Sequence, residues 1–417
     1  MSTDSLSPRS APNETIGVAP VARETRFWAP QAPEMYSRAE VGRQTGAYEA
    51  TVTSPIAEQR FEISAHDSAD IEEAARSLLE FDSYTRSRLG TDPQALGPMS
   101  AILLRTESAS SSQIEQLTTS AKQIALAELD EGSKHNAHLV IGNVRAMEAA
   151  LRLADAIEIS SILAMHFELL PRSAALSEHA GRFREEAVWI GGDNAGPIGA
   201  DFVAPHHDNV AGAMEDLVAF ARRRDLPVIL QIAIAHAQFE TIHPFVDGNG
   251  RTGRALSQAM LRHLGLAAHA TVPISAGLLV DTEGYFAALD HYRNGDAGPI
   301  VRRFANASRF ATMSGRDLVN DLAEELDRST ELLTGVRKHS RAWQVLPHLI
   351  GQPVVNLRYV RNELGLNEMT ALRALDALTD RGVLTERSGQ SRNRVWEHRG
   401  ILNVLDGYAE KIRRVSR

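Results

Sequence analysis

The chain has 417 residues, 43% of them apolar, so it is long enough to form two or three domains with cores of their own. Its net charge of −9 argues against a surface that binds nucleic acid throughout. The sequence contains no cysteine, which excludes disulfides, thiolate zinc sites and cysteine nucleophiles, and this composition is typical of the reducing cytoplasm.

The first 45 residues are predicted to form a flexible leader, because the start of the chain is rich in Ser and Pro and lacks the apolar core of a signal peptide. Residues 46–155 are predicted to form an N-terminal helical region, since apolar residues recur there at three- and four-residue spacing. The clearest helical stretches are 71–84, 113–129 and 143–157. No stretch reaches the roughly 18 consecutive apolar residues of a membrane span, so we expect a cytoplasmic protein without a membrane partner.

Strand signals are few. Val188, Trp189 and Ile190 run into Gly191 and a second glycine, a pattern typical of a short strand that ends in a turn. The sequence therefore predicts a mainly α protein with one small β-hairpin.

The stretch 243–254, HPFVDGNGRTGR, is too polar for a core and too highly charged for an ordinary turn. It lies between two apolar helical patterns, so His243 falls at the end of the first helix. Gly248, Asn249 and Gly250, which tolerate positive φ, precede the second helix. Successive backbone amides in such a turn bind anions, and the dipole of the following helix adds to the attraction. The sequence therefore predicts a phosphate cradle.

The charged side chains of this stretch suit nucleotidyl or phosphoryl transfer. Arg251 and Arg254 offer guanidinium groups to phosphates or to a carboxylate. Asp247 is a ligand for a hard divalent cation such as Mg²⁺, and His243 can deprotonate a hydroxyl group. A solvated loop between two helices explains any two of these residues, but it does not explain all of them within twelve positions.

The same residues resemble the motif of the Fic family, HPFx(D/E)GNGRxxR, which positions 243–254 match without a departure. The resemblance covers roughly residues 45–400 and implies a Fic-fold helical core with a small β-hairpin flap. It implies transfer of AMP from ATP to a Ser, Thr or Tyr hydroxyl of a protein, with Mg²⁺ or Mn²⁺ bound and pyrophosphate released. Gly250 is intact where phosphorylating relatives carry lysine, whereas a phosphocholine-type reaction and removal of AMP from modified proteins stay open as alternatives.

Carried over to this chain, the motif makes His243 the catalytic base, Asp247 the metal ligand and Arg254 the partner of the γ-phosphate. Phe245 would anchor the loop. The residues that the resemblance assigns to the ATP site are Phe245, Gly248, Asn249, Gly250, Arg251, Thr252, Gly253, Arg254, Tyr285 and the flap residues Val188, Trp189, Ile190 and Gly191.

Two of these assignments have a purely structural alternative. Residues 188–191 resemble the flap that docks a target by strand addition, although such a run alone indicates a core strand. Residues 284–296 resemble the stretch that lines the adenosine pocket and contain Tyr285. Arg293 stands where the family often carries asparagine, and Tyr285 fits equally well as a core aromatic.

Upstream, Ser111 and Glu115 fit the pattern of the family's inhibitory helix, [S/T]xxxE(G/N), in which the glutamate would pair with Arg254. Gln116 departs from the usual Gly or Asn. The alternative is a capping box formed by Ser112 and Glu115 at the start of a helix, and both interpretations can hold together.

Residues 337–417 carry 15 Lys/Arg against 8 Asp/Glu, so this part is positive in a chain that is negative as a whole. Its pattern of three helices and a hairpin is the outline of a winged helix-turn-helix domain. The residues placed to contact DNA are Thr370, Arg373 and, in the wing, Arg387, Arg392 and Arg394. A docking or dimerisation module with the same fold is the equal alternative.

We therefore predict a leader (1–45), a helical region with the inhibitory helix (46–155), a Fic catalytic core (156–336) and a winged helix-turn-helix domain (337–417). The expected protein is a homodimeric adenylyltransferase inhibited by Glu115, which modifies a target protein or itself and binds DNA or a protein through its tail. The competing class is a DNA-binding regulator whose core only senses nucleotide. His243 favours the enzyme, because a sensor needs no base.

Overall fold

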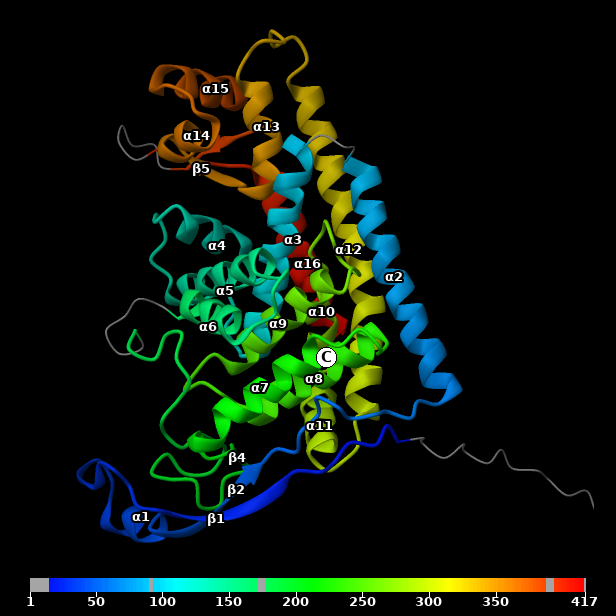
Figure 1. The fold of residues 1–417 in the computed structure, drawn as a ribbon. Helices are drawn as coiled ribbons and strands as arrows, with labels where there is room; N and C mark the ends of the chain where they lie inside the picture. Colours follow the sequence, from blue (N-terminus) through cyan, green and yellow to red (C-terminus); the bar gives the residue numbers. More distant parts are fainter. Residues whose placement is uncertain (1–14, 90–92, 171–176, 388–393, 416–417) are drawn as a thin grey trace, which may run out of the picture.

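The computed structural model describes residues 15–89, 93–170, 177–387 and 394–415, and most of them are helical (Figure 1). The first helices along the chain are α1 (Arg38–Arg43), α2 (Ala65–Leu89), α3 (Pro93–Ile114), α4 (Ala121–Glu128), α5 (His135–Arg152) and α6 (Ile159–Leu169). They are followed by α7 (Val210–Ala221), α8 (Val228–Ile242), α9 (Asn249–His263), α10 (Ile274–Leu279), α11 (Thr282–Arg293) and α12 (Gly298–Leu332). The mainly α fold class is confirmed.

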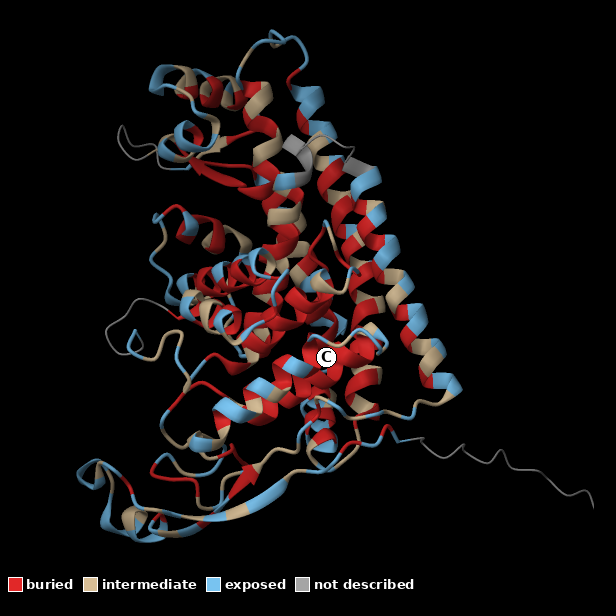
Figure 2. Cartoon of the chain, in the orientation of Figure 1, coloured by how far each residue is buried: buried red, intermediate tan, exposed pale blue. Residues whose placement is uncertain are grey.

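Among the residues that the structure describes, no helix combines the length and the apolar character needed to cross a membrane. The central helix of the fold is instead buried among other helices. Every residue of α8 from Ile229 to Ile242 is buried, and α8 packs against α7, α9 and α12 (Figure 2). The stretch 243–254 follows directly from the end of this helix, so a fully buried helix positions it.

The flexible leader predicted for residues 1–45 is wrong from residue 15 onward, while residues 1–14 lie outside the described part. β1 (Ala22–Trp28) pairs antiparallel with β2 (Gly46–Val52), and a 3₁₀ turn, η1 (Pro33–Met35), and α1 lie between them. The backbone also bonds to the core, since Val18 N donates to Gly295 O at 3.0 Å. Ile16 is buried as well. These contacts give the segment an ordered path, and we call residues 15–52 the N-terminal arm.

The predicted helix over residues 113–129 is also wrong, because the chain breaks there into two helices. α3 ends at Ile114, Gln116 takes a left-handed φ of 61°, and α4 begins at Ala121. Glu115 therefore lies at the C-terminal end of a helix. The capping box of Ser112 and Glu115 is excluded by this position, since such a box requires the start of a helix.

The small β-hairpin is present, although it is shorter than the sequence pattern indicates. β3 (Trp189–Ile190) pairs antiparallel with β4 (Phe202–Val203), and the N-terminal arm packs beside it through Trp28, Tyr48 and Ala50. After β4, a 3₁₀ turn, η2 (His207–Asn209), leads into α7. The hairpin and the arm form one end of the molecule (Figure 1).

The C-terminal part has the three helices and the hairpin that the sequence predicts, in the same order, with an additional strand, β5, and an additional last helix. Its elements are α13 (Ala342–Gly351), β5 (Val354–Asn356), α14 (Leu357–Leu364), α15 (Glu368–Asp380), β6 (Thr385–Glu386) and β7 (Val395–Glu397), and the strands form one antiparallel sheet in the order β5-β7-β6. The last helix, α16 (Arg399–Val415), leaves this unit and packs on α12, α4 and α10, because Ile401, Leu405, Tyr408 and Ile412 give it an apolar face.

The expected DNA-reading residues are distributed unevenly on this unit. Arg373 and Arg387 are exposed, and Thr370 is half-buried. Arg394 instead pairs with Glu386 at 2.5 Å and lies over the ring of Trp396. Arg392 lies outside the described residues.

Candidate active site

His243 lies where α8 ends, in a conformation that turns the chain sharply. Its φ of 50° and ψ of 60° are left-handed, its backbone N–H still bonds to Phe239 O at 2.9 Å, and Pro244 follows. Proline disfavours a helical conformation in the preceding residue, so the sequence itself ends the helix here. A non-glycine residue in this region of φ/ψ space costs about 1–2 kcal/mol, which the surrounding contacts must offset.

The loop after His243 is held from two sides. Asn249 clamps it by accepting from Phe245 N at 2.9 Å and donating to Phe245 O at 2.8 Å. Phe245 is fully buried and stacks on His166, with ring centroids 3.7 Å apart. His166 accepts from Gly181 N through Nδ1, so its Nε2 carries the proton and donates to Asp247 O at 3.0 Å. The predicted anchor role of Phe245 agrees with this burial.

The glycine-rich turn leads directly into α9. Gly248 is the N-cap with φ 82°, and α9 begins at Asn249. A side chain at Gly250 would collide with the carboxylate of Glu115 and crowd Arg254. The cradle predicted around Gly248 and Gly250 is therefore open to an anionic oxygen, and the group that now lies against it is a carboxylate.

Thr252 and Gly253, which the resemblance assigns to the ATP site, lie on the packed side of α9. Thr252 has no exposed surface, and a Cβ on Gly253 would lie 2.9 Å from the ring of Phe239. Gly253 thus allows α9 to approach α8 closely. Both side-chain positions serve helix packing in this structure.

Arg254 is held by the end of α3, which lies about 140 residues earlier in the sequence. Its Nη2 donates to Glu115 Oε1 at 2.8 Å, its Nε donates to Ser111 Oγ at 2.9 Å, and Nη2 also bonds to Ser111 O at 2.9 Å. Burial raises the pKa of Glu115, but the charge and hydrogen bond of Arg254 outweigh burial and leave this pKa below its ordinary value. The expected contact between the upstream pair and Arg254 is present.

Asp247 and Arg251 occupy the mouth of the cradle. Asp247 is half-exposed, accepts from Gly248 N at 2.7 Å and lies 3.3 Å from Arg251 Nη2. Arg251 is only 5% exposed, yet its Nε and Nη1 have no hydrogen-bond partner among the described residues. Buried guanidinium groups normally have all donors satisfied, so these two indicate a missing anionic partner. An exposed carboxylate beside such donors also fits a divalent cation shared with phosphates.

The imidazole of His243 is in the form that a base requires. Burial, and next the charge of Arg184, lower the pKa of His243 to about 4, so the ring is neutral at neutral pH. Its Nδ1 faces Glu240 O at 3.4 Å, which leaves Nε2 for the proton of a substrate hydroxyl.

Arg184 is a site residue that sequence reasoning missed. It is 3% exposed and donates to the backbone oxygens of His243 (2.8 Å), Glu186 (2.8 Å) and Pro205 (2.5 Å). It therefore ties the motif to both sides of the flap. No local pattern in the sequence marks it, because all of these partners are carbonyl groups.

Tyr285 is a buried core residue, as its structural alternative predicts. Its hydroxyl lies 2.7 Å from His236 Nε2, and only 1% of its surface is exposed. Glu240 is also buried nearby, and burial raises its pKa to about 7. Glu240 and His236 both lie against Gly253 of α9, so Tyr285 belongs to a buried polar cluster, and we assign it no direct place in a nucleotide pocket.

The flap and the N-terminal arm line a groove that reaches the motif. Trp28 packs edge-on against Trp189 with centroids 5.3 Å apart and donates from Nε1 to Ala195 O at 2.9 Å. The groove has an empty volume of about 980 Å³, partly open to solvent, and Val246 of the motif contributes to its wall. Ile190 at the tip of the flap is 46% exposed. Val188 and Trp189 are half-buried, whereas Ile190 and Gly191 are exposed, so the last two form the exposed tip of the flap.

Residues 156–261 match the model of the Fic/DOC family. This part of the chain is a Fic domain. The matched segment begins just before α6 and ends in α9, so it contains the flap, the base and the cradle. Arg254 lies inside the Fic domain, whereas Ser111 and Glu115, which hold it, lie outside.

Curated relatives of the Fic domain include a protein adenylyltransferase of Caenorhabditis elegans, 31% identical over 175 residues, which are 40% of this chain and 32% of that protein. Another, from Nematostella vectensis, is 27% identical over 161 residues, which are 38% of this chain and 34% of the relative. A probable protein adenylyltransferase of Aquifex aeolicus is 40% identical over 70 residues, which are 16% of this chain and 22% of that protein. The match thus spans about a third of the length of the first two relatives.

The fold as a whole is similar to a solved Fic family protein of Desulfovibrio desulfuricans. The similarity covers 81% of this chain and 97% of the chain of that protein, with a TM-score of 0.51 and 22% sequence identity. At this identity the likeness concerns the fold, which therefore extends well beyond the Fic domain itself.

Proposed function

We propose that this protein is an adenylyltransferase that moves AMP from ATP to a hydroxyl group of a protein. The single observation that carries the proposal is the arrangement around Arg254. The buried guanidinium of Arg254, the glycine-rich turn and the neutral imidazole of His243 all belong to the stretch 243–254. The curated relatives are named for this transfer of AMP. Arg251, with two unpartnered nitrogens, supplies a second cation for phosphate oxygens.

The proposed reaction uses each of these groups once. The γ-phosphate binds Arg254, and the backbone amides around Gly248 and Gly250 hold the phosphates behind it. The oxygen of the target hydroxyl attacks the α-phosphorus, and His243 Nε2 accepts its proton. The bond from the α-phosphorus to the oxygen bridging to the β-phosphate breaks, and pyrophosphate leaves. Mg²⁺ held by Asp247 would neutralise phosphate charge when bound.

The same arrangement makes Glu115 an inhibitor of the reaction. Its carboxylate occupies the guanidinium that should hold the γ-phosphate, and it lies against Gly250 where a phosphate oxygen belongs. ATP therefore has to compete with an intramolecular ion pair. We propose that the protein is nearly inactive until α3 releases Arg254.

The target protein would bind in the groove between the flap and the N-terminal arm. The exposed flap strand offers backbone groups for strand addition, and Trp28 and Trp189 offer apolar surface beside it. The groove reaches Val246, three residues after His243, so a side chain bound there points toward the base.

The test is incubation of the protein with α-labelled ATP and Mg²⁺, with itself as a target and then with a cell lysate. We expect weak labelling by the parent protein and strong labelling by Glu115→Gly. His243→Ala in the Glu115→Gly background should abolish the label. Absence of label from the parent and from Glu115→Gly alike, in both preparations, would exclude the transferase function. γ-Labelled ATP should give no label, which separates AMP transfer from phosphorylation.

A further inference from the structure

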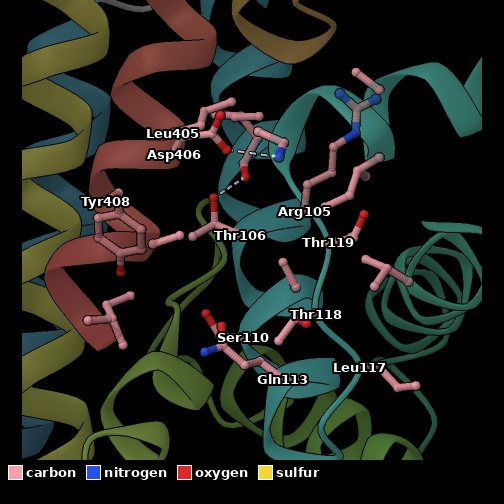
Figure 3. A pocket seen from close by; sticks show the side chains of 18 of the residues that line it. Arg105, Thr106, Ser110, Gln113, Leu117, Thr118, Thr119, Leu405, Asp406 and Tyr408 are labelled. Atoms are coloured by element: carbon pink, nitrogen blue, oxygen red, sulfur yellow. Dashed lines mark hydrogen bonds between the residues drawn. The ribbon is translucent and has the colours of Figure 1, made fainter. Parts of the chain in front are cut away.

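A pocket lies directly behind the segment that holds Arg254. It separates α3 from the C-terminal helix α16, and the linker 117–119 closes one side of it (Figure 3). Its empty volume is about 800 Å³, part of which is open to solvent. The wall formed by α16 includes Leu405, Tyr408 and Ala409. The C-terminal helix thus faces the inhibitory segment across a gap in the packing.

The pocket and the active site lie on opposite faces of α3. At 100° per residue, Thr106, Ala109 and Gln113 project roughly 140–160° away from Ser111 around the helix axis. These three residues line the pocket and are only half-buried, whereas Ser111 is completely buried against Arg254. The face of α3 toward the active site is thus tightly packed, whereas the face toward the pocket is only loosely packed.

Movement of α3 toward the pocket would separate Glu115 from Arg254. On the packed side, Glu107 accepts from Ser275 N at 2.9 Å and from Ser275 Oγ at 2.6 Å. Asn143 donates to Ser108 O at 2.9 Å. Because that side is filled, the end of α3 can withdraw only in the opposite direction, into the gap. A filled pocket would therefore hold α3 in its inhibitory position.

The polar groups of the pocket indicate the chemistry of its ligand. Arg105 already pairs with Glu128 and donates to Gly351 O, and Asp406 accepts from Ala121 N at 3.1 Å. The side chains of Ser110 and Gln113, in contrast, have no hydrogen-bond partner in the described part of the chain. The remaining lining is mostly apolar, and the groups left for a ligand are the hydroxyls of Ser110, Thr118 and Thr119 and the amide of Gln113.

We propose that this pocket binds a small uncharged molecule with an apolar body and one amide or hydroxyl group, and that the bound molecule clamps α3 against Arg254. The ligand is an allosteric inhibitor, because it stabilises the ion pair that ATP must displace. The link to catalysis rests on the proposed function, but occupancy of the pocket and the position of α3 can be measured without it.

Benzamide, benzoate and benzylamine test the ligand class, because they share a ring and differ in charge. Saturable binding of benzamide to the whole chain is expected by ligand-observed NMR, with at least tenfold weaker binding of the two charged probes. Ala409→Phe should fill the pocket and remove binding, whereas Asn403→Phe, exposed on the same helix, should retain it. The proposal would be overturned if benzamide does not bind, if a charged probe binds equally well, or if Ala409→Phe leaves benzamide binding unchanged.

A covalent occupant tests the clamp, and the chain suits this experiment because it has no cysteine of its own. Ala409→Cys is labelled with N-phenylmaleimide, and Asn403→Cys labelled in the same way is the matched control. The amides of Glu115 and Leu117 bond to Ser112 O at 3.1 and 3.0 Å, so their hydrogen exchange reports how firmly this segment is held. The label at 409 should slow exchange roughly fivefold or more, within the usual range of allosteric coupling.

The same labelled proteins should also bind ATP differently. The label at 409 should weaken ATP binding roughly fivefold in the parent sequence and leave it unchanged in Glu115→Gly. Faster exchange, or an equal effect of the label at 403, would overturn the clamp. If exchange and ATP affinity respond as expected while Glu115→Gly transfers no AMP, the proposed function fails and the pocket stands.

Discussion

Arg254 makes two of its hydrogen bonds to a single residue, Ser111, through the hydroxyl and through the carbonyl oxygen of that residue. The hydroxyl bond fixes the plane of the guanidinium, and Glu115 accepts from Nη2, the same nitrogen that donates to Ser111 O. The serine therefore orients the arginine for the glutamate. The inhibition proposed above would therefore depend on both residues.

Ser111→Ala should consequently activate the protein, but less than Glu115→Gly does. A hydrogen bond to a charged group contributes about 1.5–3 kcal/mol, so transfer or ATP affinity should rise by roughly tenfold. The measurement is the rate of self-labelling together with ATP affinity by calorimetry. Ser108→Ala is the control, because Ser108 on the same helix is also fully buried and its hydroxyl has no hydrogen-bond partner in the described structure. Equal effects of the two substitutions would contradict the orienting role.

Gly248→Ala should destabilise the protein more than the matched change at Gly265. Both glycines have φ of 82°, which costs an alanine about 1 kcal/mol or more. A Cβ on Gly248 would also lie 2.6 Å from Leu169 Cδ2, whereas nothing lies within 4 Å of a Cβ on Gly265. We expect losses of about 2–3 and about 1 kcal/mol, respectively, in urea unfolding. Equal losses would show that Leu169 moves aside freely.

The motif could be predicted from the sequence because all of its groups are local. His243, the cradle and Arg254 lie within twelve residues, and the apolar periodicity on either side places them at two helix ends. The upstream pair was also recognisable as a pattern, although its position at the end of α3 was not. The apolar periodicity continues through 113–129, and the only local signal of the break is the polar stretch Thr118-Thr119-Ser120, in which Ser120 caps α4.

Other features were beyond sequence reasoning because their partners are distant in the chain. Arg184 bonds only to carbonyl groups, which every residue possesses. The Ser/Pro-rich start of the chain predicts a flexible leader, and the N-terminal arm departs from this because Trp28 packs against Trp189, a contact distant in the sequence. α16 was assigned to the tail because it is contiguous with it, whereas its apolar face belongs to α12.

Trp28→Ala should weaken recognition of the target protein without affecting ATP. The substitution removes the edge contact with Trp189 and the hydrogen bond to Ala195 O, so the flap loses the support of the arm. In the Glu115→Gly background, KM for the target should rise about tenfold while KM for ATP stays constant. Phe27→Ala, at a position 73% exposed, should change neither constant. A parallel rise of both KM values would show that the arm does not act specifically on binding of the target.

His398 should make stability fall as the pH is lowered. Burial depresses the pKa of His398 to about 4, below its ordinary value of 6.5. Between these values the unfolded chain binds more protons, so the contribution is complete above about pH 6.5 and is lost toward pH 4. Its size is at most about 3 kcal/mol. His398→Gln should flatten the decline of unfolding free energy between pH 6.5 and 4.5, and the exposed His339→Gln should leave it unchanged.

The 35-residue helix α12 runs about 52 Å and packs against helices of the Fic domain, of the N-terminal region and of the C-terminal part. A single cluster of buried apolar side chains contains residues of α12 together with residues as far apart in the sequence as Ile16 and Ile412. The parts that are distinct along the sequence are therefore one unit thermodynamically, and heat should unfold them in a single calorimetric transition. Severing the chain after α12 would expose its apolar face and lower the cooperativity of the catalytic part as well.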